Sequence, residues 1–176
     1  MNNLKKIVFF LLTITAIQSC GFNVNYYNLT GIDLGDAKTF QVNFFKNYAS
    51  QNSGSTIEPG LDRDFTQALQ ELLLNQTKLD LTTSNSDLLY EGEIVEYKIS
   101  PMTATAQQTA AQNRLTMTVN VRFFNHTKED SDFESRFSFF FDYPANAMLQ
   151  TVKNQAHHEI FERLTQEIFN KSLYDI

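Results

Sequence analysis

The chain has 176 residues, a usual size for one domain with a proper hydrophobic core. Its formal net charge is −6 and its lysines and arginines are scattered along the sequence, which excludes the electrostatic footprint of a nucleic-acid-binding protein. The same charge balance offers no broad basic surface for anionic lipid head groups. The chain contains a single cysteine, which excludes a disulfide bond within it.

The N-terminal residues have the organisation of a secretory signal peptide. Lys5 and Lys6 form a short positive segment, and residues 7–17 form an apolar stretch directly after them. As a helix, this stretch rises only about 17 Å, whereas the hydrocarbon core of a bilayer is about 30 Å thick. We therefore interpret the stretch as part of a cleaved leader and not as a membrane span.

The single cysteine, Cys20, comes at the end of this leader and directly after Ser19. A small residue followed by a cysteine after a short apolar run resembles the lipobox of bacterial lipoproteins, although Gln18 is larger than the residue preferred at that place. We expect residues 1–19 to be a lipoprotein signal peptide and Cys20 to be the lipidated first residue of the mature protein. A plain secretory peptide is the alternative.

The remainder is expected to form an extended lead-in over residues 20–36 and a single domain over residues 37–176. Apolar residues recur at helical spacing in two segments and at alternate positions in others, and Asn, Ser, Gly and Pro mark the loops between them. In chain order, the expected elements are a strand over 37–45, a polar loop over 46–60, a helix over 61–76, a short strand over 78–82, strands over 88–100, 114–124 and 133–143, and a helix over about 146–172.

The strand over 88–100 changes its apolar face partway along. Its first half has apolar residues at the positions of Leu88, Tyr90 and Ile94, whereas Val95, Tyr97 and Ile99 have the opposite parity. Because a slip of one residue moves side chains to the other face of a sheet, this pattern predicts a β-bulge or a sharp twist, which we place near Gly92.

The strands over 114–124 and 133–143 are predicted to form an antiparallel hairpin around a polar loop. Every second residue from Leu115 to Phe123 is apolar, and the following strand repeats the alternation apart from Phe140, an aromatic residue on the polar face. Two helices and these strands predict an α+β fold of two layers. In it, both helices pack on one face of a four- to five-stranded, mostly antiparallel sheet.

Candidate catalytic and metal-binding residues are few. His158 and Glu162 have the i, i+4 spacing of metal ligands on a helix, but two donors do not hold a zinc ion. Glu91 and Glu93 share a strand face without a nearby nucleophile, general acid or glycine-rich loop. We interpret these side chains as solvated surface residues and predict neither a catalytic nor a metal site, and therefore no enzyme activity.

Three short motifs resemble the LptE family of lipopolysaccharide-assembly lipoproteins. The sequence Cys20-Gly21-Phe22 looks like the mature N-terminus of that family, residues 117–121 (MTVNV) resemble its central strand, and residues 139–144 (FFFDYP) resemble its last strand before a closing helix. The order of the expected elements also agrees with the family over the whole mature chain.

The resemblance implies a lipoprotein held at the periplasm-facing inner leaflet of the outer membrane by an N-acyl diglyceride on Cys20, with no other cofactor. It also implies a partner, the LptD β-barrel, which LptE-like proteins plug and help to assemble for insertion of lipopolysaccharide into the outer leaflet. Phe124 and Phe140 are the candidates for contact with this partner; the alternative is that the lead-in covers them. An unrelated envelope lipoprotein that binds a small ligand or a peptide is the alternative function.

Some family members bind lipopolysaccharide through basic residues near a loop at the tip of the domain and near the start of the last helix. Here the corresponding loop, residues 102–113, has no lysine or arginine, so only Arg114 and Lys153 are candidates. Phosphate groups call for charge-assisted hydrogen-bond donors, which are scarce at these positions. Direct binding of lipopolysaccharide is therefore a weaker expectation than the plug role.

Overall fold

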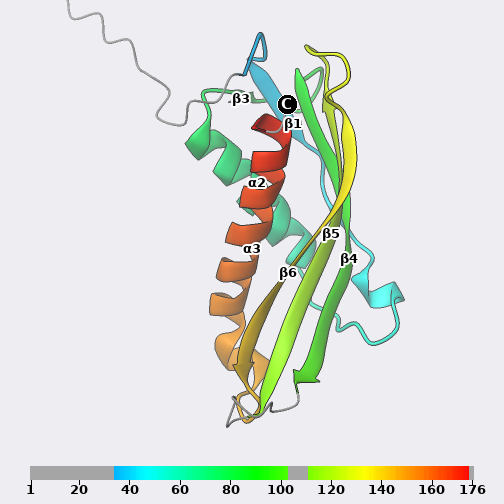
Figure 1. Cartoon of the computed structure of the whole chain (residues 1–176), viewed down its shortest axis with the longest axis vertical. Helices are drawn as coiled ribbons and strands as arrows, with labels where there is room; N and C mark the ends of the chain where they lie inside the picture. The colour runs from blue at the N-terminus through cyan, green and yellow to red at the C-terminus, as the bar shows by residue number, and fades with distance from the viewer. Residues whose placement is uncertain (1–33, 103–110, 175–176) are drawn as a thin grey trace, which may run out of the picture. The chain divides into compact units, whose positions relative to one another are not determined.

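A mixed β-sheet forms one layer of the computed structural model, and two helices cover one face of it (Figure 1). The structure describes residues 34–102 and 111–174, so Cys20 and most of the predicted lead-in lie outside the described residues. The elements, in chain order, are β1 (Thr39–Val42), β2 (Lys46–Asn47), the 3₁₀ helix η2 (Ala49–Gln51), α2 (Leu61–Gln76), β3 (Asp80–Leu81), β4 (Leu88–Met102), β5 (Gln112–Asn125), β6 (Phe133–Pro144) and α3 (Leu149–Leu173).

The predicted α+β class and the placement of both helices on one face are confirmed, but the sheet differs from the expected one. It has six strands in the order β3-β1-β4-β5-β6, with β2 also paired to β4. Strands β4, β5 and β6 are antiparallel, whereas β1 and β2 run parallel to β4. The connection from β2 to β4 passes through α2, and a crossover through a helix is how parallel strands are joined.

The loop expected over residues 46–60 contains β2 and η2 and closes the edge of β4. Beyond β2, the Asn52 side chain donates a hydrogen bond to the carbonyl oxygen of Val95. The Thr56 amide then donates to the carbonyl oxygen of Tyr97 at 2.8 Å. This polar segment therefore satisfies backbone groups of β4 that would otherwise lie at an open sheet edge.

The predicted change of face in β4 is confirmed, but its position is wrong. The pairing of β4 with β5 shifts between Ile94 and Glu96, which makes Val95 the bulged residue. Gly92 stays in register opposite Val121. A Cβ atom on Gly92 would lie 2.5 Å from the Phe45 ring, so this glycine allows an aromatic side chain to pack directly on the strand.

The core lies between the sheet and the helices. The five alternate residues of β5 that the sequence placed inside are all fully buried: Leu115, Met117, Val119, Val121 and Phe123. Phe65 on α2 joins the layers, because its ring lies 5.2 Å from that of Phe45 and 5.7 Å from that of Phe161 on α3. Truncating a buried phenylalanine of this kind costs about 3–5 kcal/mol of stability.

Candidate interaction surface

The sheet face that points away from the helices carries a network of polar side chains from β4, β5 and β6. Arg122 lies 3.8 Å from Glu91 and 3.4 Å from Glu93, both on the neighbouring strand. The Asn120 side chain donates hydrogen bonds to Glu93 at 3.2 Å and to Glu134 at 2.7 Å. These cross-strand pairs follow from the antiparallel register, in which alternate residues of neighbouring strands lie side by side.

Arg114 and Phe140 meet on this polar face. The Arg114 guanidinium donates two hydrogen bonds to the Asp142 carboxylate, at 2.7 and 2.8 Å, and lies 3.5 Å from the centre of the Phe140 ring. The hydrogen bond to Asp142 raises the pKa of Arg114 above its usual value. The Phe140 ring also stacks on Phe139 and remains 42% exposed. The Arg114 guanidinium is thus already engaged within the protein, by the Asp142 carboxylate and the Phe140 ring.

Phe124 lies on the same face as Phe140 but far from it. Phe124 pairs with Leu89 at one end of β5, whereas Phe140 pairs with Thr116. Eight residues of strand separate Phe124 from Thr116, which corresponds to about 27 Å. Phe124 is half-buried, so the structure places the two candidate contact residues at separate sites on this face.

Lys153 lies in the helical layer, on the opposite side of the sheet from Arg114. Its ammonium group donates a 2.9 Å hydrogen bond to the carboxylate of Glu58, whose side chain is 9% exposed. The two basic residues that the sequence proposed for lipopolysaccharide therefore do not form one site. No local sequence pattern indicates the Lys153–Glu58 pair, because the two residues are brought together only by the path of the loop before α2.

Tyr97 on β4 and His157 on α3 form a partly buried pair that was not among the predicted site residues. The Tyr97 hydroxyl lies 2.9 Å from Nε2 of His157, and the His157 ring stacks on Phe161 at 5.2 Å. Burial lowers the pKa of His157 below its usual value, and the nearby Glu58 carboxylate opposes this shift. A signal was present in the sequence, since His157 follows Lys153 by one helical turn and Tyr97 has inward parity.

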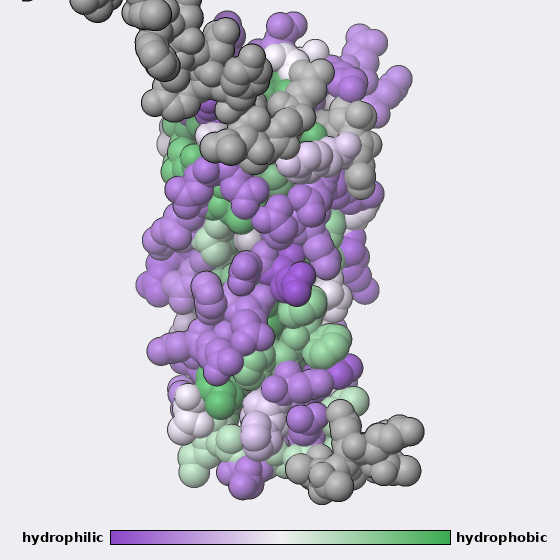
Figure 2. All heavy atoms as spheres, turned by 60° about the vertical axis from the view of Figure 1, so that its left-hand side comes forward, coloured by the Kyte–Doolittle hydropathy of each residue, from purple (hydrophilic) through white to green (hydrophobic). Residues whose placement is uncertain are grey.

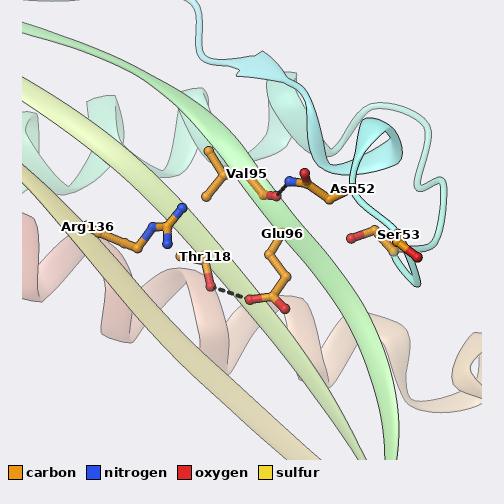
Figure 3. A pocket seen from close by; sticks show the side chains of 7 residues that line it. Asn52, Ser53, Val95, Glu96, Thr118 and Arg136 are labelled. Carbon is orange, nitrogen blue, oxygen red and sulfur yellow. Dashed lines mark hydrogen bonds between the residues drawn. The ribbon is translucent and has the colours of Figure 1, made fainter.

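A polar hollow of about 270 Å³ lies where the loop before α2 overhangs the sheet (Figure 3). Within it, the Thr118 hydroxyl donates a 2.9 Å hydrogen bond to Glu96. Figure 3 shows the Arg136 guanidinium extending from β6 over the hollow, and Arg136 has no ion pair within the described part of the chain. The residues that line the hollow are Asn52, Ser53, Ser55, Val95, Glu96, Thr118 and Arg136.

The helical side of the domain is mostly hydrophilic, with hydrophobic atoms gathered in its lower half (Figure 2). Among residues 34–102 and 111–174, no helix has the length and apolar character needed to cross a bilayer. In the same residues, no three histidine, aspartate or glutamate side chains lie close enough together to share a metal ion.

The fold and the hydrogen-bonded sheet face define an α+β module in which two helices cover one face of a mixed sheet and a polar network lies on the other. The chain belongs to the LptE family, because the sequence model of this family, described as lipopolysaccharide-assembly, matches residues 37–172. A comparison with curated proteins finds no match.

Several solved structures are similar to this chain at low sequence identity. A minor lipoprotein from Acinetobacter baumannii is 14% identical, with a TM-score of 0.46, over 75% of this chain and 89% of the other. The rare lipoprotein B from Shewanella oneidensis is 13% identical, with a TM-score of 0.43, over 74% of this chain and 89% of the other.

Proposed function

We propose that this protein is a non-enzymatic outer-membrane lipoprotein that occupies the lumen of the LptD β-barrel and supports insertion of lipopolysaccharide into the outer leaflet. In this proposal, an N-acyl diglyceride on Cys20 holds it at the periplasm-facing leaflet and no other cofactor is needed. Membership of the LptE lipopolysaccharide-assembly family supports the general role. The partner, the site of anchoring and the plug position are parts of the proposal.

The observation that carries the plug position is the continuous polar network on the outer face of β4, β5 and β6. The interior of a membrane β-barrel is polar, so a domain that fills it needs donors and acceptors on its surface rather than an apolar patch. Arg122 with Glu91 and Glu93, and Asn120 with Glu134, provide such groups in a fixed arrangement. Individual exposed ion pairs contribute only about 0–1 kcal/mol to folding, so their value here is complementarity to a partner.

The rival function, binding of a small ligand or a peptide by an unrelated envelope lipoprotein, has less support. The hollow at Arg136 measures about 270 Å³ and is lined mainly by polar side chains. Pockets for small molecules usually enclose about 300–1,000 Å³ and are mostly apolar. Direct capture of lipopolysaccharide by Arg114 and Lys153 is also disfavoured, because a lipid phosphate would compete with Asp142 and Glu58.

Co-purification from detergent-solubilised envelopes tests the proposal. We expect the tagged full-length protein to bring down LptD in a stable complex, and we expect LptD to be misassembled in cells depleted of the protein. An unrelated outer-membrane barrel of abundant expression is the specificity control. Recovery of the protein without LptD, together with normal assembly of LptD after depletion, would contradict the proposed function.

A further inference from the structure

Strand β6 forms an open edge of the sheet. It is the last strand in the order β3-β1-β4-β5-β6, and among the described residues its backbone pairs only with β5. In an antiparallel strand, half of the backbone groups face away from the neighbour, so these groups of β6 have no protein partner within the described part of the chain. The other side of the sheet differs, because β1, β2 and the segment from Asn52 to Thr56 pair with β4, and the strands that end the sheet there, β2 and β3, have only two residues each.

The sequence of β6 protects this edge only through charged residues on its outer face, Glu134, Arg136 and Asp142. Natural proteins protect open edges with lysine, proline, β-bulges or inward-pointing charges. Strand β6 has twelve residues, no lysine and no register shift against β5, and its proline is the last residue, Pro144. Its inward-facing residues Phe133, Phe137, Phe139 and Phe141 are aromatic. An edge of this length that has no bulge, no internal proline and no inward-pointing charge is a template for an added strand.

Three cations that have no ion pair among the described residues flank this edge. Arg136 lies on the outer face of β6. Arg163 and Lys171 reach from α3 to the inward side of the strand, where they lie 5.8 Å from the ring centre of Phe139 and 5.3 Å from that of Phe133. The other three arginines, Arg63, Arg114 and Arg122, are all in ion pairs. Four lysines elsewhere, Lys38, Lys46, Lys98 and Lys128, also have no ion pair among the described residues, so these three cations are distinguished by their place beside the open strand.

We propose that the open edge of β6 binds an extended, acidic segment of the barrel partner as an additional strand. Main-chain hydrogen bonds supply affinity in this mode, and alternate side chains supply specificity. The segment carries an acidic residue on the outer side, opposite Arg136, and acidic and apolar residues on the inner side, toward Arg163, Lys171 and the phenylalanine rings. The proposal rests on the proposed function, which supplies the partner protein.

The three cations favour an acidic partner segment over a second copy of this chain as the occupant of the β6 edge. Pairing of two β6 strands would bring two copies of the same three cations into one interface, because a two-fold interface repeats the same surface patch. The resulting excess of positive charge is unfavourable, whichever residues of the two strands lie opposite each other. An acidic partner segment removes this repulsion and gives each cation a carboxylate.

Site-specific photo-crosslinking in the assembled LptD complex tests the position of this strand. A photo-crosslinking residue at Ser138, exposed on β6, is compared with one at Lys46, exposed at the opposite edge. We expect the residue at Ser138 to crosslink to one acidic segment of LptD, and hydrogen exchange of β6 amides to slow at least tenfold on complex formation. A complex in which β6 amides exchange as in the free protein, or in which Ser138 crosslinks to a second copy, overturns the inference and leaves the proposed function standing. Absence of any complex removes both.

Charge reversal supplies a second measurement. We expect the double variant Arg136→Glu/Arg163→Glu to weaken the complex with LptD by about tenfold, because two partly exposed ion pairs are lost. The matched control is Lys38→Glu/Lys46→Glu, which changes the net charge equally at exposed sites beside β1 and on β2, away from β6. Unfolding curves of both variants establish that the fold is retained. Equal affinity of the two double variants would overturn the role of the cations.

Discussion

At the scale of single residues, Lys153 acts as a structural cation. Its partner Glu58 is almost fully buried, and a buried carboxylate that loses its partner is strongly destabilising. We expect Lys153→Met to lower the free energy of unfolding by about 1–3 kcal/mol, the lower values reflecting the partial exposure of the lysine. Urea denaturation at pH 7 measures this change.

A double-mutant cycle distinguishes the loss of the pair from the loss of lysine packing. Glu58→Gln removes the negative charge, so the double variant Lys153→Met/Glu58→Gln should be less destabilised than the sum of the two single variants. Arg63→Met, which breaks an exposed ion pair with Asp64, is the control and should change stability by less than about 1 kcal/mol. Strict additivity of the Lys153 and Glu58 effects would contradict the structural role.

His157 should make the stability of the domain depend on pH. Burial lowers its pKa in the folded state, so below the usual value of about 6.5 the unfolded chain binds more protons at this position than the folded chain does. The stabilisation is therefore present above about pH 6.5 and is lost as the pH falls through the lowered pKa. We expect the unfolding free energy to decrease between pH 7 and pH 5, with a smaller decrease in His157→Gln.

His158 is the natural control for this measurement. It is the next residue on α3 and is exposed, so His158→Gln should leave the slope of stability against pH unchanged. Asp87 affects the stability in a separate pH range. Hydrogen bonds from the Lys38 amide and from Thr39 lower the pKa of Asp87 in the folded state. Its contribution to the unfolding free energy is therefore lost only under more acidic conditions, as the pH falls below about 4. Equal slopes for His157→Gln and the unmodified protein between pH 7 and pH 5 would exclude His157 as the cause.

At the scale of elements, the sequence predicted the long strands and both helices because their apolar periodicity is sustained. The buried stripe of α2, which includes Leu61, Phe65, Leu69 and Leu73, recurs at four-residue steps over its whole length. The short strand expected over residues 78–82 is confirmed as β3, but β2 lies in a segment that was expected to be a loop, since its pairing is set by the crossover through α2 and not by local propensity. The parallel pairing of β1 and β2 with β4 could therefore not be predicted from the sequence.

The bulge in β4 shows where parity alone stops being informative. The alternation of apolar and polar residues indicated a change of face between Ile94 and Tyr97, where the structure has its register shift. The bulge was nevertheless predicted near Gly92, because glycine is common at bulges. The structure uses Gly92 for close packing of Phe45 and places the extra residue at Val95, which lines the polar hollow with Glu96. The contact that fixes this position, from Asn52 to the Val95 carbonyl, is non-local.

Deletion of Val95 is a direct test of the bulge. Without it, either the residues before or the residues after the bulge must turn to the wrong face, which would expose Tyr97 and Ile99 or bury polar side chains. We expect deletion to lower the free energy of unfolding by more than about 3 kcal/mol, whereas Val95→Ala keeps the residue count and should cost less than about 1.5 kcal/mol. Similar stability of the two variants, measured by urea denaturation, would show that the extra residue does not set the register.

At the scale of the whole molecule, the sheet separates two kinds of surface. The outer face is a hydrogen-bonded polar network that continues to the open edge of β6, and the inner face is occupied by the helices. The sequence predicted the polar parity of the outer face, but it did not show that its two candidate residues for lipopolysaccharide, Arg114 and Lys153, lie on opposite sides of the sheet. Sequence spacing carries no information on the side of a sheet to which a distant helix packs.

The proposed lipid anchor on Cys20 and the proposed barrel contact would be two independent means of holding the protein at the outer membrane. An acyl chain contributes about 0.8 kcal/mol for each buried CH₂ group, and stable anchoring takes more than one chain or a second signal. We expect Cys20→Ala to abolish lipid attachment, measured by intact mass, and to move the protein from the membrane to the soluble fraction in cells that lack LptD. Ser19→Ala keeps a small residue before Cys20 and should change neither property.

In cells that contain LptD, the same Cys20→Ala protein measures how strongly the proposed barrel contact alone holds the domain at the membrane. If the polar sheet face and the β6 edge hold the domain in the barrel, a substantial part of the unlipidated protein should still sediment with outer membranes, and the Arg136→Glu/Arg163→Glu changes should release it. If the lipid is the main attachment, Cys20→Ala alone should release nearly all of it. Fractionation of these two variants with and without LptD separates the contributions, because each combination removes a different attachment while leaving the buried core unchanged.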